Sequence, residues 1–351
     1  MDSARSSVTP APAVVTLQHV ADRAGVARAT ASLALNGKGR MTEETRERVR
    51  SVAEKLGYAA NPTARNLRAA RSGSIGLYVP DHTLSFRYYM DVAFGAVERA
   101  QEADLLVTLM PVVVTPHSSF LDHLDGFIMI DPFDEDPMVR RLLEGRRPVV
   151  SGERAPVDMP APFATVYSDH VAGIRLLLDH LWDQGSRSPT AILPGSSLEW
   201  GRQMRRGYEQ WCAEKGIEAR FLVAPFQMSA AELRDSCDKL LTAPGGMDAI
   251  ITSTEGTAVI ARDAIRSAGM VIGRDILLAS YVDSDPLSMT EPSITALNLR
   301  PREFGRQCVT LLLDGISDAA ESGRSIEVAV SLVARQSSQW LSPSQPDSAR
   351  R

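Results

Sequence analysis

The sequence contains few cysteines and no long apolar run, and each shortage excludes a class of protein. Only three of its 351 residues are cysteine, an odd and widely spaced set that argues against a disulfide scaffold, fits a reducing compartment and predicts buried thiols. No stretch approaches the roughly 18 uninterrupted apolar residues of a membrane helix, so we expect no membrane partner. Residues 1–15 are rich in Ser, Pro and Ala but lack the apolar core of a signal peptide. This composition predicts a flexible arm and a cytoplasmic location.

The signatures of common enzymes are missing as well. The sequence has no G-x-S-x-G, no P-loop and no complete G-x-G-x-x-G, and its six histidines do not form H-E-x-x-H or another metal-ligand spacing. No nucleophile and base stand at an interpretable spacing. We therefore expect no catalytic residue, no metal and no cofactor.

Charge is distributed unevenly along the chain. Residues 1–72 contain twelve Lys and Arg against six Asp and Glu, a net charge of +6, whereas the rest contains 26 basic and 37 acidic residues, a net charge of −11. A compact basic head is expected where a protein neutralises nucleic-acid phosphates. By charge alone, a solvated helical surface with an excess of arginine is an equally good interpretation.

The head has the pattern of three short helices over residues 16–60. Thr16 can cap a helix over 17–24, which Gly25 ends, and a second, alanine-rich helix over 26–35 stops at an Asn-Gly turn. A third helix follows Thr42 and ends at Gly57. Two short helices joined by a glycine turn are typical of a helix-turn-helix, whose second helix can enter a major groove, although small helical units also serve as structural caps.

Residues 61–73 suggest a short extra helix that folds only with a partner. Asn61 can cap it and Pro62 suits its first position, but isolated helices below roughly 12 to 15 residues are unstable in water. Leu67 is the large apolar residue of this segment. It either packs on a neighbouring helix or wedges between base steps in a minor groove.

From Ser74 onward the pattern changes to apolar strands alternating with amphipathic helices. This alternation predicts parallel sheets covered on both faces, arranged as two α/β lobes over 74–340, with a single large enzyme domain as the alternative. The expected strands are 75–79, 105–110, 127–130, 148–150, 191–194, 249–252 and 276–282, and the expected helices are 90–103, 171–184, 202–215 and 256–268. Small ligands bind in clefts at the carboxyl ends of such strands.

The run from Val15 to Asp81, VTLQHVADRAGVARATASLALNGKGRMTEETRERVRSVAEKLGYAANPTARNLRAARSGSIGLYVPD, resembles the start of the lactose-repressor family of bacterial transcription regulators, which includes the purine and galactose repressors. Later landmarks resemble the same family: LDGFIMI (124–130), SDHVAG (168–173), GRQMRRGY (201–208), EPSITAL (291–297) and VARQSS (333–338). The resemblance covers nearly the whole chain. It implies an all-α helix-turn-helix head followed by an α/β two-lobed, periplasmic-binding-protein-like body with parallel sheets.

The resemblance also implies which residues read DNA. Arg28, Ala29 and Leu33 match the base-contacting positions, and Arg28 could pair with guanine while the other two offer apolar contacts. Thr30 and Ser32 suit phosphate contacts. Leu33 stands where the family commonly has a polar reader, and a core position is its alternative interpretation. Ala27 stands where a capping Ser is usual.

In the family, the short helix from each of two subunits pairs in the minor groove. The resemblance therefore implies a wedge at Leu67, flanked by Ala64 and Arg68. It also implies three crossings between the lobes, near 165, 296 and 326, so that lobe 1 spans about 74–165 and 297–325 and lobe 2 about 166–296 and 326–340. The stretch Pro111–His123 is short for the covering helix expected there.

The expected effector site lies between the lobes. Its implied contacts are Arg202, Asp169, Phe86, Trp200 and Asp283. A surface salt bridge is the alternative for Arg202, and a helix cap is the alternative for Asp169. Val282 replaces one member of a usual Asp-Asp pair and Thr254-Glu255 stands in for Asn-Asp, so a sugar-type hydrogen-bond set is incomplete.

These features predict a sequence-specific transcription regulator, a repressor in most of this family, that binds a palindromic double-stranded DNA operator as a homodimer. A small-molecule effector, a sugar or related metabolite, would modulate it. The tail over 341–351 has no apolar heptads, which argues against a tetramer through a C-terminal coil. The alternative is a cytoplasmic small-molecule-binding protein or enzyme with an accessory helical head.

Overall fold

The computed structural model describes residues 15–35, 37–58, 71–80, 86–110, 119–195, 197–225 and 228–341. The chain divides into two compact units, Met1–Ala70 and Arg71–Arg351. Residues 1–14 of the predicted arm, the segment with Ala64, Leu67 and Arg68, and the tail after Leu341 lie outside the described residues.

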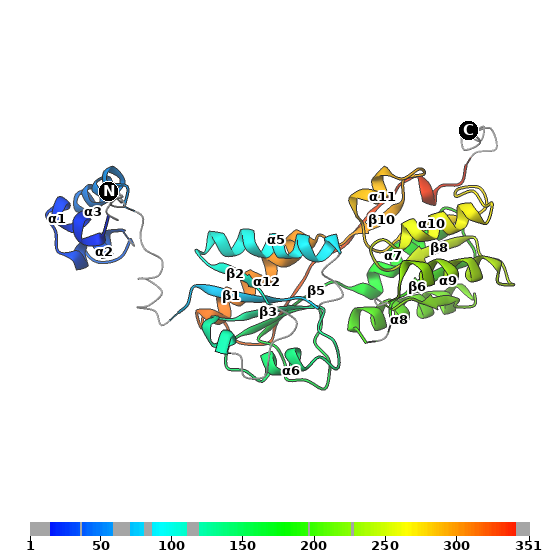
Figure 1. Ribbon diagram of the computed structural model, residues 1–351, viewed down its shortest axis with the longest axis horizontal. Coiled ribbons are helices and arrows are strands. Elements are labelled where there is room, and N and C mark those ends of the chain that lie inside the picture. The colour runs from blue at the N-terminus through cyan, green and yellow to red at the C-terminus, as the bar shows by residue number, and fades with distance from the viewer. Residues whose placement is uncertain are drawn as a thin grey trace, which may run out of the picture. The chain divides into compact units, whose positions relative to one another are not determined.

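The first unit, the head, contains helices α1 (Leu17–Ala24), α2 (Arg28–Leu35) and α3 (Glu43–Leu56) (Figure 1). Thr16 and Thr42 cap α1 and α3 as predicted, and Gly25 and Gly57 end them in the left-handed conformation. Thr16 also forms a capping box with His19. The three helices enclose a small core of Val and Ala side chains: Val20, Ala21, Ala24, Ala31, Ala34, Val49 and Ala53.

The predicted start of the second helix was wrong by two residues. We expected it at Val26, but α2 begins at Arg28, and Ala27 provides the first carbonyl acceptor, to the N–H of Ala31 at 2.9 Å. The physical reason is that the N–H of Val26, after the left-handed Gly25 with φ of 67°, donates back to the carbonyl of Ala21 at 3.0 Å, so Val26 belongs to the end of α1.

The second unit, the body, consists of two α/β lobes (Figure 1). Lobe 1, residues 71–167 and 299–327, contains β1 (Ser74–Tyr78), α5 (Arg87–Glu102), β2 (Leu106–Leu109), η2 (Ser119–His123), β3 (Phe127–Ile130), α6 (Pro137–Leu143), β4 (Val149–Gly152), β5 (Ala164–Tyr167), α12 (Pro301–Ile316) and β11 (Arg324–Glu327).

Lobe 2, residues 168–298 and 328–341, also consists of alternating strands and helices. It contains α7 (His170–Asp183), β6 (Pro189–Leu193), α8 (Glu199–Lys215), β7 (Phe221–Val223), α9 (Ala230–Thr242), β8 (Ala249–Thr252), α10 (Thr257–Ser267), β9 (Leu277–Ser280), α11 (Asp285–Met289), β10 (Thr295–Asn298), β12 (Ser331–Val333) and η3 (Gln336–Ser338).

Both sheets follow the same doubly wound order. Sheet 1 runs β11-β5-β4-β3-β1-β2 and sheet 2 runs β12-β10-β9-β8-β6-β7. Their strands pair in parallel, except that β12 is antiparallel to β10. The central strands β3, β4, β8 and β9 are buried along their whole length, as expected for a sheet covered on both faces.

Each sheet lies between two helical layers. In lobe 1, α5 and α12 cover one face and α6 the other (Figure 1). In lobe 2, α7 and α8 cover one face, and α9 and α10 the other. The three cysteines are free and buried in these layers, which confirms the predicted buried thiols.

The crossings between the lobes come slightly later than the sequence indicated. We expected them near 165, 296 and 326, but β5, β10 and β11 continue their sheets to Tyr167, Asn298 and Glu327. Ladder hydrogen bonds decide these ends: β11 pairs with β5 through its last residue, Glu327 opposite Tyr167.

The predicted short stretch between β2 and β3 is only partly described. Residues 119–123 form the 3₁₀ helix η2, and residues 111–118 lie outside the described part. Leu106 and Leu109 of the edge strand β2 are exposed.

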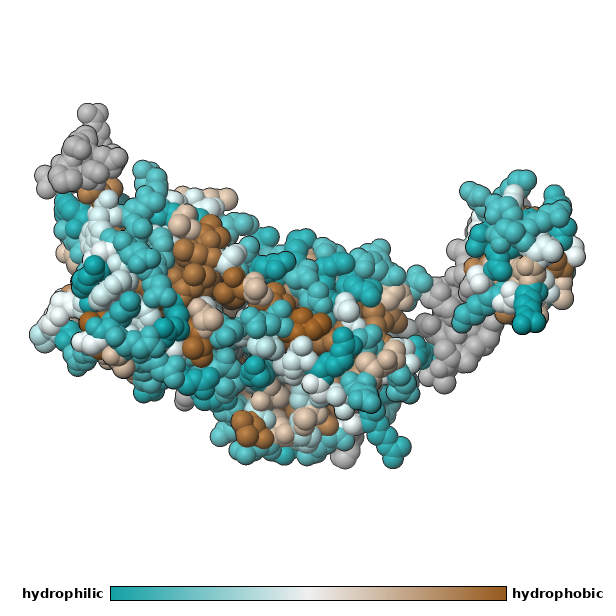
Figure 2. Space-filling model, turned by 180° about the vertical axis from the view of Figure 1, so that it is seen from behind, coloured by the Kyte–Doolittle hydropathy of each residue, from teal (hydrophilic) through white to brown (hydrophobic). Residues whose placement is uncertain are grey.

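In the described part of the chain no helix is long and apolar enough to cross a membrane. Figure 2 shows a mostly hydrophilic surface from behind, with apolar residues in separate patches.

Asp125 fixes the start of the body. Its buried carboxylate accepts the backbone N–H of Ser72 and that of Gly73, each at 2.8 Å, and its own N–H donates to the carbonyl of Ser74 at 2.8 Å. The residues that lead into β1 are thereby held against the start of β3.

We expect Asp125→Ala to destabilise the body by about 2 kcal/mol, because the buried Gly73 N–H loses its acceptor. Scanning calorimetry of the full chain measures the change. Asp122→Ala, an exposed neighbour on η2, serves as the matched control. Equal melting temperatures for the two variants would contradict this role.

Candidate functional site

Helix α2 presents the predicted base readers on one exposed face. Arg28 and Ala29 are exposed, and Leu33 is 43% exposed, while Ala31 and Ala34 on the opposite face are buried. The core position considered for Leu33 is therefore not what the structure shows. Thr30 and Ser32, the predicted phosphate contacts, are half-buried at the edges of this face.

The position before the first residue of α2 does not hold one of the usual capping residues. Ala27 occupies the N-cap position and has no oxygen to accept the first N–H groups of the helix. Such N–H groups, with the positive end of the helix dipole, suit a phosphate oxygen. The three predicted minor-groove residues Ala64, Leu67 and Arg68 are outside the described residues.

In the body, the carboxyl ends of strands from both sheets contribute to one pocket between the lobes. Asp131 follows β3, Glu153 follows β4, and Ser253 follows β8. The described lining consists of Phe86, Tyr88, Tyr89, Asp131, Glu153, His170, Trp200, Ser253, Thr254, Glu255, Tyr281, Val282 and Leu299. Carboxyl ends of parallel strands are where doubly wound folds bind ligands.

Buried acidic residues form the polar part of this pocket. His170 lies between Glu153, with Nε2 and Oε2 3.0 Å apart, and Tyr281, with Nδ1 and the hydroxyl 2.8 Å apart. Tyr89 donates its hydroxyl to Asp131. Asp131 and Glu153 both have positive φ, 47° and 76°, a conformation that is uncommon for non-glycine residues and recurs at ligand sites.

Burial and the charge of Glu153 together shift the pKa values of these groups. Burial and the nearby charge of Glu153 raise the pKa of Asp131 to about 7, against the hydrogen bond from Tyr89. Burial alone would lower the pKa of His170, but the charge and hydrogen bonding of Glu153 outweigh it, and the pKa is raised. Burial and neighbouring acids also raise the pKa values of Tyr89 and Tyr281 well above 10, so both remain donors.

We expect Asp131→Asn to remove a pH dependence of stability. The pKa of Asp131 rises from 3.8 to about 7 on folding, so the native state binds this proton more tightly than the unfolded state. Wild-type stability from this group is present at low pH and is lost as the pH rises from about 4 to about 7. One pKa unit corresponds to about 1.4 kcal/mol.

Relative to Asp131→Asn, the free energy of unfolding of the wild type should therefore fall by about 1–3 kcal/mol between about pH 5 and about pH 8. Urea unfolding followed by circular dichroism measures it. The exposed Asp158→Asn is the control. A wild-type stability that rises relative to Asp131→Asn over this range would contradict the assignment.

Besides the contact of Glu153 with His170, further contacts connect the lobes around this pocket. The N–H of Tyr88, in the first turn of α5, donates to Glu255 at 3.0 Å. Arg202 of α8 binds the carboxylate of Asp134 with two hydrogen bonds of 2.6 and 3.2 Å. Arg87 lies 3.4 Å from Asp285. The pocket is therefore bordered by ion pairs and a backbone hydrogen bond that join one lobe to the other.

The five predicted effector contacts do not all lie in the same pocket. Phe86 and Trp200 line the pocket, as the sequence indicated. Asp169 caps α7 by accepting the N–H of Ala172 at 2.9 Å. Arg202 pairs with Glu199 as well as Asp134 and is not among the lining residues. For Asp169 and Arg202, the described contacts are those of the alternative interpretations.

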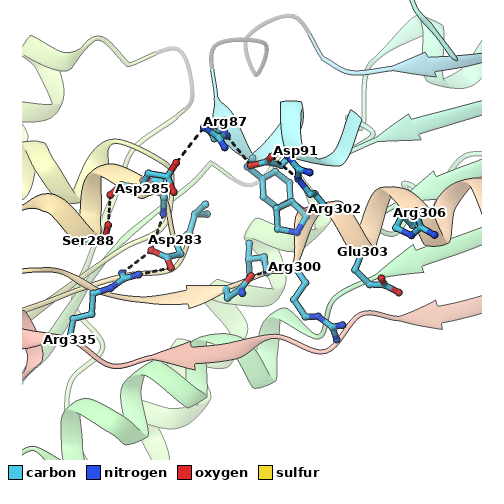
Figure 3. A pocket seen from close by; sticks show the side chains of 16 residues that line it. Arg87, Asp91, Asp283, Asp285, Ser288, Arg300, Arg302, Glu303, Arg306 and Arg335 are labelled. Atoms are coloured by element: carbon cyan, nitrogen blue, oxygen red, sulfur yellow. Dashed lines mark hydrogen bonds and ion pairs between the residues drawn. The ribbon is translucent and has the colours of Figure 1, made fainter. Parts of the chain in front are cut away.

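Asp283, the fifth, lies in a neighbouring groove at the lobe junction (Figure 3). There it forms two hydrogen bonds of 2.8 Å with Arg335. Arg87, Asp91, Asp285 and Arg302 form further ion pairs in this groove, and Figure 3 shows them side by side. The groove is thus lined by paired charges.

Most of the residues that line the pocket were not predicted from the sequence. Asp131, Glu153, His170, Ser253 and Tyr281 were not singled out, although Asp131 and Glu153 each directly follow an apolar strand. An acidic residue at that position was the available signal. Within the described residues no group of His, Cys, Asp and Glu has the arrangement to hold a metal ion.

Comparisons with known proteins place this architecture in a family. The model of the lacI family of bacterial regulatory proteins matches residues 16–61, and the periplasmic binding protein-like domain matches residues 178–338. The HTH-type transcriptional regulator CelR of Thermobifida fusca is 26% identical over 337 residues, 92% of this chain and 98% of the relative. The sucrose operon repressor of Klebsiella pneumoniae is 32% identical over 217 residues, 59% of this chain and 63% of the relative.

A solved structure shares the fold over nearly the whole chain. The lac repressor dimer bound to operator and the anti-inducer ONPF superimposes with a TM-score of 0.71 at 23% identity, covering 93% of this chain and 99% of that chain. The order of the parts is also the same, with a lacI-type head before a two-lobed body. This protein therefore belongs to the lacI family of bacterial regulatory proteins and is a DNA-binding transcription regulator.

Proposed function

We propose that the protein is a repressor that reads a palindromic operator with α2 in the major groove. The observation that carries this proposal is the exposed face of α2 in a basic head that matches the lacI model. Arg28 would pair with guanine, and Ala29 and Leu33 would contact thymine methyl groups. Thr30, Ser32 and the backbone N–H groups at the start of α2 would hold phosphates.

Residues 61–73 would form the link between the head and the body. We propose that Leu67 enters a central base step in the minor groove, next to Ala64 and Arg68, when two subunits dock together. The segment would then fold only on DNA, because a helix of this length is unstable alone. The body, 74–340, would bind the effector and form the dimer.

Helix α5 offers a surface for that dimer. Met90, Phe94 and Val97 follow one another at helical spacing and are 38%, 49% and 44% exposed, an apolar stripe on the outer face of the helix. A two-fold axis beside α5 would bury the stripe against its own copy. Two heads could then reach half-sites about one helical turn apart.

We expect Phe94→Glu to weaken dimerisation by about 30-fold or more, since it places a charge in the centre of the contact. Sedimentation equilibrium measures the dissociation constant, and operator affinity should fall with it. Val157→Glu is the control, because Val157 is 92% exposed in a loop packed beside α6 rather than on α5. Dimers of unchanged strength in Phe94→Glu would rule out this surface.

We propose that the pocket between the lobes binds a small-molecule effector. Its support is the position of the pocket at the strand ends and its bridging by contacts from both lobes, which a ligand could strengthen or break. Several relatives are named for sugars, among them the CelR–cellobiose complex and the sucrose operon repressor. The protein would act in the cytoplasm and would catalyse no reaction.

The test is selection of bound duplexes from a random pool by the full chain at fixed salt, with and without a panel of metabolites. We expect a palindrome, and its enrichment should change with one class of metabolite. Enrichment of no symmetric site would overturn the regulator proposal. Removing residues 1–72 distinguishes the alternative: a regulator loses DNA binding and keeps ligand binding, whereas an enzyme keeps turnover.

A further inference from the structure

We propose that the effector of the interlobe pocket is an organic cation, whose ammonium group lies between Asp131, Glu153 and Glu255 and whose body packs on the aromatic rings. This inference rests on the proposed effector function and specifies its ligand class. It follows from the charge, the hydrogen-bonding groups and the rings of the described lining.

The pocket has an excess of negative charge. Three carboxylates line it, and the described lining contains no Lys and no Arg. His170 is its basic group, and it is already held between Glu153 and Tyr281. A bound anion would meet uncompensated repulsion here, and a neutral ligand would bury the carboxylates without balancing their charge.

The pocket also offers more acceptors than donors. The hydroxyls of Tyr89, Tyr281 and Thr254 are engaged with Asp131, His170 and Thr257. The described lining has no Asn or Gln. A ligand that donates hydrogen bonds and carries positive charge satisfies such a site, since carboxylates only accept.

One buried hydroxyl in the pocket has no hydrogen-bond partner among the described residues. It is the Oγ of Ser253, a residue that is 1% exposed. Buried polar groups are almost always satisfied, so an orphaned hydroxyl in this pocket points to a ligand group or water there. It lies at the carboxyl end of β8, two residues before Glu255.

Aromatic rings form the walls. Tyr88 and Tyr89 pack edge to face with centroids 5.2 Å apart, and Phe86 lies 6.5 Å from Tyr89. Trp200 and Tyr281 flank His170 at 5.9 and 5.8 Å. Ring faces attract cations through their quadrupole, and cages of such rings select quaternary ammonium groups. The described acids do not have the arrangement for a metal ion, which favours a larger organic cation.

Two of the pocket carboxylates have raised pKa values. Burial and the charge of Glu153 raise the pKa of Asp131 to about 7, and burial raises that of Glu255. A cation would lower both. The titratable groups that face Asp131 are Tyr88, Tyr89, Glu153 and His170. Since loss of the His170 proton also adds negative charge, cation affinity should rise with pH across neutrality.

The experiment compares matched probes on the full chain by calorimetric titration and thermal shift. Choline, whose charge does not titrate, is paired with its neutral carbon analogue 3,3-dimethylbutan-1-ol, and phenethylammonium is paired with 2-phenylethanol. Cellobiose is the sugar arm. We expect the cations to bind and to raise the melting temperature, and the neutral partners and cellobiose to bind at least about tenfold more weakly.

Variants locate the site. Asp131→Asn and Glu255→Gln, both close in size to the native residues, should weaken choline binding by about tenfold or more. Asp285→Asn, in the neighbouring groove, is the control and should leave it unchanged. Circular dichroism shows which variants fold, and the choline affinity of the wild type at about pH 6 and about pH 8 provides a readout that needs no variant.

Equal binding within the pairs, preference for cellobiose, or binding by neither cation would overturn the inference, as would choline binding that Asp131→Asn and Glu255→Gln leave intact. These outcomes differ from failure of the proposed regulator. If choline binds in the pocket but no duplex is selected, the regulator proposal fails and the cation site stands. If a palindromic duplex is selected and its binding changes only with neutral sugars, the regulator proposal stands and the cation site fails.

Discussion

Replacing Gly95 with alanine is expected to lower the stability of the body by about 3 kcal/mol. Helices α5 and α12 cross so closely at this point that a Cβ on Gly95 would lie 2.0 Å from the carbonyl oxygen of Arg302. Gly305 faces it in the same way, and its Cβ would lie 2.0 Å from the carbonyl oxygen of Val92. Backbone atoms cannot rotate away, so the two helices must separate and open the core of lobe 1.

Scanning calorimetry of the full chain should show the body melting several degrees lower in Gly95→Ala. The variant should also bind effector less well, because α5 carries Tyr88 and Tyr89 into the pocket. Gly195→Ala is the control, since a Cβ there meets no heavy atom within 4 Å and φ is not positive. A melting temperature of Gly95→Ala equal to that of Gly195→Ala would show that the helices adapt without cost.

Arg28→Ala is expected to reduce affinity for the selected operator by about 10- to 100-fold while affinity for random duplex falls little. A bidentate arginine–guanine pair contributes roughly 1–3 kcal/mol of discrimination, whereas phosphate contacts act on every sequence alike. Arg28 is the first residue of α2, on the exposed face that also holds Ala29 and Leu33. Losing it should relax the base preference at one position of each half-site.

Arg50→Ala tests whether any exposed arginine of the head would give the same result. Arg50 lies on α3 and is 3.9 Å from both Glu43 and Glu47. Fluorescence anisotropy at fixed salt, with operator and random duplex in parallel, measures both affinities. If Arg28→Ala and Arg50→Ala lose operator and random affinity in equal proportion, Arg28 contributes only charge.

Elements with strong local signals could be predicted from the sequence. Thr16 with Gly25, and Thr42 with Gly57, delimit α1 and α3 because capping and left-handed glycine depend on the nearest few residues. The strands FIMI and AIIT match β3 and β8 residue for residue, since an apolar run that short, between breakers, favours a buried strand.

Elements without such signals were missed. No helix was predicted over Pro301–Ile316, although α12 packs against α5 and covers sheet 1. The edge strand β7 is partly exposed, so it has no continuous apolar run to indicate it. Several strand ends were displaced by one or two residues because pairing with a neighbour, as of β11 with β5, decides them.

The candidate site shows the same division. Phe86 and Trp200 were predicted to face the pocket, and in the structure both line it. Arg202 instead pairs with Asp134, and Asp283 with Arg335, and both partners are far away in the sequence. Which carboxylate pairs with which cation depends on where separate strand ends meet. No local pattern contains that information.

By itself, the sequence determined the helix-turn-helix head and the two-lobed α/β body, because caps, glycine turns and apolar periodicity act over a few neighbouring residues. It indicated the class of function through its resemblance to the lactose-repressor family. Only the tertiary structure decided that Asp131, Glu153, His170 and Glu255 share one buried pocket. The physical reason is that the charge of a pocket belongs to strand ends from two sheets, which become neighbours only when the lobes have folded.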